Sequence, residues 1–143
     1  MVSDISQLLR ILEVHPNVAA ANKLLKEVKT LLVKGLHGSS RALFSATLYN
    51  KQPRTFLFIL NDLETAGYFY HDVTQILGTK DILFFPSAYK RAAKYGQMDP
   101  ANEILRTEVL SRLQNNDSSL FIVSYPDALA EKTVSQATLQ QNT

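Results

Sequence analysis

The residues with the clearest capacity for chemistry form a glycine-containing loop, Gly35 to Ala42, which follows a short apolar run. Such glycines allow backbone N–H groups to close around phosphate oxygens, as in the P-loop pattern G-x-x-x-x-G-K-[ST]. In that pattern the lysine reaches the β and γ phosphates, and the final hydroxyl binds magnesium. The loop is therefore the first candidate for a phosphate site.

The loop departs from this pattern at three positions. Gly35 matches the first glycine, but Ser40 stands where the second glycine belongs. Arg41 replaces the lysine and Ala42 replaces the hydroxyl, so the metal ligand is lost. We therefore expect no ATP hydrolysis, no catalytic residue, and no cofactor or metal bound to this chain. The degenerate loop consists of Gly35, Gly38, Ser39, Ser40, Arg41 and Ala42.

Two simpler functions of the loop stay open. It can be a plain strand-to-helix connection, with Ser39 or Ser40 capping the helix that follows. It can also keep a residual anion site, because helix N-termini attract anions and Arg41 carries a positive charge. In the second case an anion is expected at the N–H groups of Ser39 to Arg41.

A basic and aromatic segment is the second candidate site. Aromatic rings can stack on bases while basic side chains contact phosphates, which is how many proteins hold single-stranded nucleic acid. A solvated surface explains the same composition without any ligand. The residues of this possible nucleic-acid or partner patch are Tyr89, Lys90, Arg91, Lys94 and Tyr95.

Composition excludes several other classes of protein. The 143 residues are enough for one domain, with 45% hydrophobic and 20% charged residues and a net charge of +2. The absence of cysteine excludes a disulfide scaffold, a thiolate zinc site and a cysteine nucleophile. His15, His37 and His71 lack the spacing of metal ligands. No apolar run approaches the ~20 residues of a membrane span, so we expect a cytoplasmic monomer without membrane contact.

The apolar pattern predicts an α/β fold. Two helices are expected over residues 1–30, interrupted at Pro16 because a proline disfavours helix at the residue before it. Beyond residue 30 strands alternate with helices, which is typical of a parallel sheet with crossover helices. The run 55–60 is apolar after its threonine, as in a strand covered on both faces. About four strands are expected, near residues 31–34, 55–60, 82–85 and 120–124, with helices near 41–49, 63–77, 100–113 and 126–130.

The order of these segments resembles the N-terminal module of the bacterial transcription-repair coupling factors, the Mfd family. That module is itself similar to the first domain of the nucleotide excision repair protein UvrB. The resemblance covers about residues 31–134. It depends on Gly38-Ser39-Ser40-Arg41-Ala42, the strand Thr55–Leu60, the helix after Asn61-Asp62-Leu63, the segment Asp99–Arg106, and the segment Leu120–Leu129.

The resemblance implies a P-loop NTPase-like fold of the UvrB domain 1 type without functional Walker motifs. It implies a UvrB-like α/β domain at 31–133, which follows the helical segment at 1–30. The polar composition of residues 134–143 predicts a flexible tail, which in this family would lead to an absent downstream domain. The function implied is a non-catalytic scaffold that helps recruit UvrA to stalled RNA polymerase. UvrA would bind mainly through the domain that follows. RNA polymerase, DNA, ATP and magnesium would be bound by absent regions, including the motor domains.

Two alternative functions remain at this stage. The first is a free-standing anion- or nucleotide-binding α/β protein with a weakened P-loop. The second is a nucleic-acid-binding fragment of a helicase-like protein. A reading frame that continues far beyond Thr143 would favour the coupling factor, whereas a stop near Thr143 would favour the alternatives.

Overall fold

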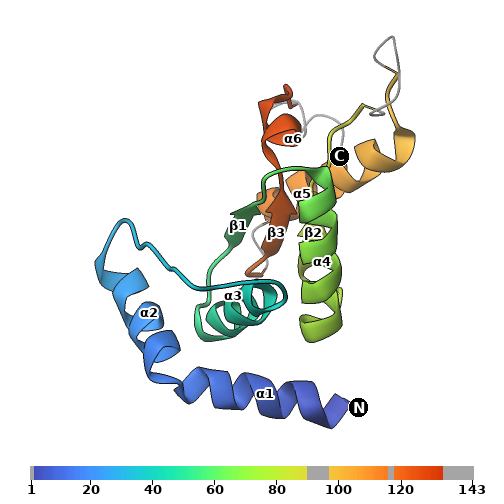
Figure 1. The fold of residues 1–143 in the computed structure, drawn as a ribbon. Helices are drawn as coiled ribbons and strands as arrows, with labels where there is room; N and C mark the ends of the chain where they lie inside the picture. The colour runs from blue at the N-terminus through green and yellow to red at the C-terminus, as the bar shows by residue number, and fades with distance from the viewer. Residues whose placement is uncertain (1, 90–96, 116–117, 134–143) are drawn as a thin grey trace.

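The computed structural model describes residues 2–89, 97–115 and 118–133, and Figure 1 shows its elements. The predicted tail at 134–143 lies outside these residues. In chain order the elements are α1 (Val2–Val14), α2 (Pro16–Glu27), α3 (Ser40–Lys51), β1 (Phe56–Ile59), α4 (Leu63–Leu77), β2 (Ile82–Phe84), α5 (Pro100–Asn115), β3 (Phe121–Ser124) and α6 (Pro126–Ala130).

The described strands form one parallel sheet with the order β1-β3-β2. Phe121 of the central strand pairs with Phe56 on one side and with Ile82 on the other. All residues of β3 are buried, as expected for a strand with neighbours on both edges and helices on both faces. The α/β class, the parallel pairing and these strand positions are confirmed.

The strand predicted at 31–34 is wrong. Residues 31–37 instead form an irregular connection from α2 to α3 (Figure 1), outside the described sheet. Leu32 is 76% exposed and Val33 is 40% exposed. An apolar run becomes a strand only where its backbone hydrogen bonds pair with a neighbouring strand. Val33 and Leu36 line a cavity with Phe58 and Ile59 of β1, but residues 31–37 form no strand pairing with it. The described sheet therefore has three strands in place of about four.

Helices cover the two faces of the sheet unequally. Helices α3 and α4 lie on one face, and α5 packs on the other face near β2. The core on the α3 side is aromatic: the ring of Phe58 stacks on Phe121 at 4.2 Å, and Tyr49 meets Phe121 edge-on at 5.5 Å. Offset and edge-on pairs of this kind stabilise a core beyond their buried area.

Strand β1 is covered on one face only, contrary to the expectation for residues 55–60. Phe56 and Phe58 are partly buried against the α3 side, but Leu57 is 51% exposed and Ile59 is 56% exposed. The reason is position: β1 is an edge strand of the described sheet, whereas α5 has its main strand contacts with β2. A continuous apolar run does not distinguish an edge strand from a central one.

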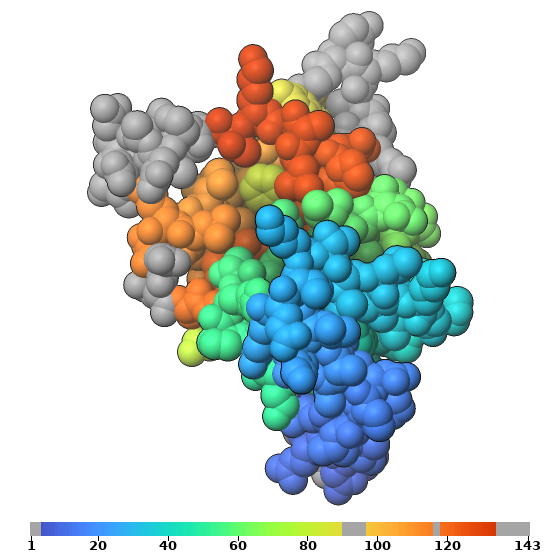
Figure 2. Space-filling model, turned by 90° about the vertical axis from the view of Figure 1, so that its left-hand side faces the viewer, coloured from blue at the N-terminus to red at the C-terminus, as the bar shows by residue number. Residues whose placement is uncertain are grey.

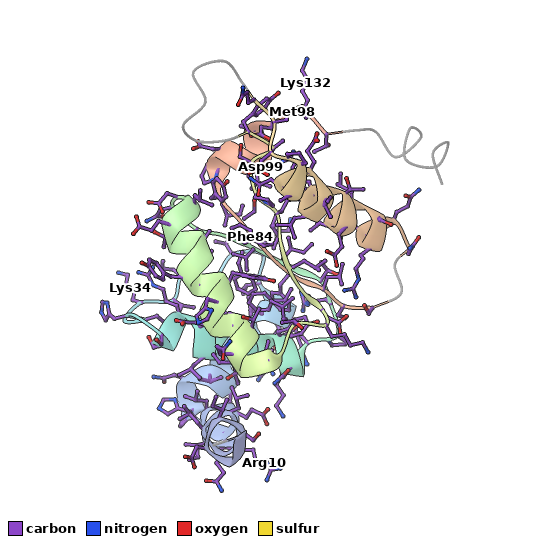
Figure 3. All side chains as sticks on the ribbon, turned by 90° about the vertical axis from the view of Figure 1, so that its right-hand side faces the viewer. Arg10, Lys34, Phe84, Met98, Asp99 and Lys132 are labelled. Atoms are coloured by element: carbon purple, nitrogen blue, oxygen red, sulfur yellow. The ribbon has the colours of Figure 1, made fainter. Side chains whose placement is uncertain are left out.

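The N-terminal helices pack on α3. Their predicted break is confirmed, and the side chain of His15 accepts a hydrogen bond from the N–H of Asn17 where α2 begins. Lys51 at the end of α3 forms an ion pair with Glu13 at 2.9 Å. Figure 3 shows Arg10 of α1 on the outer side, directed away from the rest of the fold. Within the described residues, no helix is both long and apolar enough to span a membrane.

Candidate functional site

The loop before α3 contains two glycines in the left-handed region. Gly35 has φ of 87° and Gly38 has φ of 52°. A Cβ added at either position would meet nothing within 4 Å. These glycines are therefore required by the backbone conformation of the loop and not by the close approach of another part of the chain.

The backbone of the loop closes on itself. The N–H of Ser40 donates to the carbonyl of His37 at 3.1 Å, and the N–H of Arg41 donates to the carbonyl of Gly38 at 3.3 Å. The Ser40 hydroxyl donates to the His37 carbonyl at 2.6 Å and accepts from the His37 N–H at 2.8 Å. A phosphate cradle needs convergent N–H groups that are free to bind oxygen. Of the N–H groups of Ser39, Ser40 and Arg41 that were expected to hold an anion, the last two already donate to carbonyls within the loop.

The residues that replace the lysine and the hydroxyl point in different directions. Ala42 is 1% exposed and belongs to the hydrophobic core, so its position faces away from any ligand in the loop. Arg41 is exposed, and its Nε donates to the carbonyl of Leu36 at 3.4 Å. Ser39 occupies the N-cap position of α3 without a side-chain capping bond.

A small cavity lies between this loop and α4, beside Leu60 at the carboxyl end of β1. Its volume is about 240 Å³. In open α/β sheets ligands bind beyond the carboxyl ends of the strands, so this is the expected place for a phosphate. Arg41 and Asp72 both line it, which mixes positive and negative charge. The nearby N-terminus of α4 is capped by a carboxylate, because Asp62 Oδ1 accepts the N–H of Thr65 at 2.8 Å.

A larger cavity of about 520 Å³ lies on the other side of the loop, between α2, the connection and α3. Its lining is mainly aliphatic and includes Val18, Leu24, Leu31 and Leu43, with Lys34 as a charged member. Figure 3 shows Lys34 at the periphery of the fold. An apolar lining can bury hydrocarbon but offers little to an anion.

Most of the predicted basic and aromatic patch, Lys90, Arg91, Lys94 and Tyr95, lies outside the described residues. Tyr89 is described and is 47% exposed. It pairs with Met98 in an isolated antiparallel bridge, and the N–H of Asp99 donates to the carbonyl of Ala88 at 2.7 Å. Figure 3 shows Met98 and Asp99 together at the start of α5. Nucleic-acid contact by the patch stays a prediction.

The sequence analysis missed a buried polar cluster around Arg106. This residue is 6% exposed, and its Nη1 lies 3.3 Å from Oε2 of Glu131. Glu131 also accepts hydrogen bonds from the hydroxyl of Ser87 and the N–H of Ala88. One available signal was the position of Arg106, three residues before the buried Val109 on the same helix face. The cluster joins α5 to the segment after β2 and to the end of α6.

The three histidines, His15, His37 and His71, are exposed. The described part of the chain contains no group of three or more histidine or acidic side chains placed to hold a metal ion.

Comparison with known proteins gives one informative relative. No family model matches the chain, and no solved structure matches it. The chain is similar to the transcription-repair-coupling factor of Bacillus subtilis (strain 168), with 26% identity over 101 residues. The aligned part is 71% of this chain but 9% of that protein's length. This partial similarity agrees with the resemblance to the coupling factors that the order of the sequence segments indicated.

Proposed function

We propose that this chain is a module of a transcription-repair coupling factor. Such a protein would recruit the nucleotide excision repair machinery, through UvrA, to stalled RNA polymerase. This module would act as a non-catalytic scaffold. The proposal depends mainly on the 26% identity with the Bacillus subtilis coupling factor over 71% of the chain.

The closed loop supports the non-catalytic part of the proposal. Its Ser40 and Arg41 N–H groups are bonded within the turn, and the Ala42 side chain is buried in the core. A hydrolysing P-loop would need those N–H groups and a hydroxyl directed at bound magnesium. The arrangement suits a descendant of a P-loop fold that has lost nucleotide chemistry.

In this proposal the remaining activities belong to other parts of a longer protein, because the chain aligns with only 9% of its relative. ATP hydrolysis, magnesium, DNA and RNA polymerase would be handled by those parts. UvrA would bind mainly through the domain that follows this module. The module's surface would position that domain.

The test is repair of ultraviolet lesions in the organism that encodes the chain. Removing the coding region for residues 1–143 from its gene should abolish the faster repair of the transcribed strand relative to the other strand. Arg41→Ala is the matched control, and it should leave the preference intact because the loop performs no chemistry. An unchanged strand preference after the deletion would contradict the proposal.

One observation favours a second candidate function, anion binding. Arg41 lines the cavity of about 240 Å³ at the end of β1. Asp72 lines the same cavity, and its negative charge opposes a phosphate there. Anion binding therefore ranks behind the scaffold function.

A further inference from the structure

The positive charge of this chain is concentrated in one segment. Residues 15–41 contain five lysine and arginine residues and one acidic residue, a net charge of +4, whereas the whole chain carries +2. The rest of the chain is therefore slightly acidic in total. The five basic residues, which we call the basic surface, are Lys23, Lys26, Lys29, Lys34 and Arg41.

The side chains of the basic surface are available to a ligand. All five are exposed, and so is Glu27, the one acidic residue of the segment. Within the described part of the chain none of the five forms an ion pair, whereas Lys51, Arg106 and Arg112 each pair with a carboxylate. Positive charges gathered without acidic partners create a potential that attracts anions.

The basic surface extends over α2, the connection and the start of α3. Lys23 and Lys26 are neighbours on the surface of α2, because they lie three residues apart in one helix. Lys29 and Lys34 follow on the connection, and Arg41 lies in the first turn of α3. Figure 2 shows α2 in blue and the connection in lighter blue as one continuous part of the surface. The charge is therefore spread along one face and is not gathered around a single pocket.

The phosphodiester backbone of duplex DNA has the charge that such a surface can bind. It carries one negative charge for every ~1.7 Å of helix axis, so separate lysines can each neutralise a different phosphate. Lysine contacts to phosphates carry no information about base sequence. Single strands fit less well, because they are held by stacking on aromatic rings and residues 15–41 contain no aromatic residue.

An anionic membrane also fits less well than duplex DNA. Binding in a membrane interface requires an apolar face that enters the lipid beside the lysines. The exposed aliphatic side chains of Leu24, Leu32 and Val33 line the cavity of about 520 Å³ and form its walls. Val28, which is 41% exposed, is then the one large aliphatic side chain of the described segment left for contact with lipid.

We propose that the basic surface binds the phosphodiester backbone of duplex DNA without preference for base sequence. This contact goes beyond the proposed repair function, which assigns DNA to other parts of a longer protein, and does not depend on it. The affinity of this chain alone is low, because non-specific phosphate contacts give dissociation constants of about 10⁻⁴ to 10⁻⁶ M at physiological salt.

Fluorescence anisotropy of the 143-residue chain with a labelled duplex of about 20 base pairs tests the proposal over a range of salt concentrations. Neutralisation of about four phosphates should give a slope of about −4 for the logarithm of the affinity against that of the salt concentration. The affinity should therefore fall about a hundredfold from about 50 to about 200 mM salt. Lys26→Gln and Lys34→Gln should each weaken binding and reduce the size of the slope by about one.

The matched control is Lys132→Gln. It removes the same charge from an exposed lysine, which Figure 3 shows far from Lys34, and it should leave the affinity and the slope unchanged. Circular dichroism checks that all three variants fold. A loss of affinity in Lys132→Gln equal to that in Lys26→Gln would overturn the proposal, because the net charge and not the basic surface would then control binding.

Three further samples test the chemistry of the ligand. A second duplex of unrelated sequence should bind with the same affinity as the first. A single strand of the same length and vesicles that contain phosphatidylserine should bind more weakly than the duplex. No binding to duplex at about 50 mM salt, a clear preference for one of the two sequences, or tighter binding to the single strand or the vesicles would overturn the proposal.

Discussion

The guanidinium of Arg106 lies between the carboxylate of Glu131 and the ring of Phe85. Its Nη1 is 3.3 Å from Glu131 Oε2, and its central carbon is 4.2 Å from the Phe85 ring centroid. The same nitrogen donates to the carbonyls of Pro86 at 2.8 Å and Ala128 at 3.0 Å. One side chain thus joins α5 to the end of the β2 segment and to α6.

Loss of the Arg106 charge should destabilise the fold strongly. Arg106→Met leaves the Glu131 carboxylate without its cation in a site where the two side chains are 8% and 17% exposed. Breaking a buried pair from one side costs about 3–5 kcal/mol of unfolding free energy. The control is Arg112→Met, which breaks a more exposed pair with Asp81 and should cost about 1 kcal/mol. Urea unfolding measures both, and equal losses would contradict the assigned role of Arg106.

The chain should not bind Mg-ATP at low micromolar concentration, because the Ser40 and Arg41 N–H groups are bonded within the loop. Calorimetry with Mg-ATP checks this. Ala42→Ser should not create binding, and it should lower stability by about 1 kcal/mol because it places a hydroxyl in the core. A micromolar isotherm that Arg41→Ala abolishes would show that the loop binds nucleotide.

Two glycine substitutions should change stability in opposite directions. Gly38→Ala forces a side chain into a backbone with φ of 52° and should cost about 1 kcal/mol, whereas Gly38→Asn should cost less because asparagine tolerates this region. Gly67 lies inside α4, where an added Cβ meets nothing within 4 Å. Gly67→Ala should therefore stabilise the protein by up to about 1 kcal/mol. Thermal unfolding of the three variants measures the difference, and a shift of the same sign for both alanines would contradict this reading of the glycines.

Stability should fall at alkaline pH partly through Tyr49. Burial raises the pKa of Tyr49 above the ordinary tyrosine value of 10.0, and the nearby Asp81 carboxylate adds to this while Arg112 opposes it. The unfolded chain therefore loses the tyrosine proton first, and stability decreases as the pH rises above about 10. Tyr49→Phe should make this decrease shallower. It should also cost about 1 kcal/mol at neutral pH, because the Tyr49 hydroxyl donates to the Ser119 carbonyl at 2.5 Å. If the stability of both proteins decreases equally with rising pH, other groups control the decrease. Tyr70 is one such group, because burial also raises its pKa.

Sequence patterns correctly predicted those features of the fold that depend on residues close together in the chain. The helix break before Pro16 and the strands at 82–84 and 121–124 follow from a proline and from continuous apolar runs. The strand predicted at 31–34 failed because strand formation also depends on a neighbour. The prediction that residues 55–60 form a strand covered on both faces is wrong at Leu57 for a related reason. The position of a strand in its sheet is set by segments far away in the chain.

The residue types of the candidate site could be predicted from the sequence, but its hydrogen bonds could not. The missing lysine and hydroxyl of the loop can be read from Arg41 and Ala42. The bonds from His37 to Ser40 that close the loop depend on backbone angles that no pattern encodes. The burial of Arg106 likewise depends on Glu131 and Ser87, which lie far away in the chain and show no periodic signal.

The order β1-β3-β2 places the last strand of the chain in the middle of the sheet. Phe56 of β1 pairs with Phe121, so the sheet cannot begin to form on the ribosome until β3 has left the exit tunnel. Until then β1 and β2, though already synthesised, lack the strand that joins them, and the apolar residues 56–60 are available to other nascent chains. Slowing translation shortly before β3 should lengthen this vulnerable period and increase aggregation. The same pause placed before residue 55, when β1 is not yet synthesised, should have little effect on the yield of folded protein.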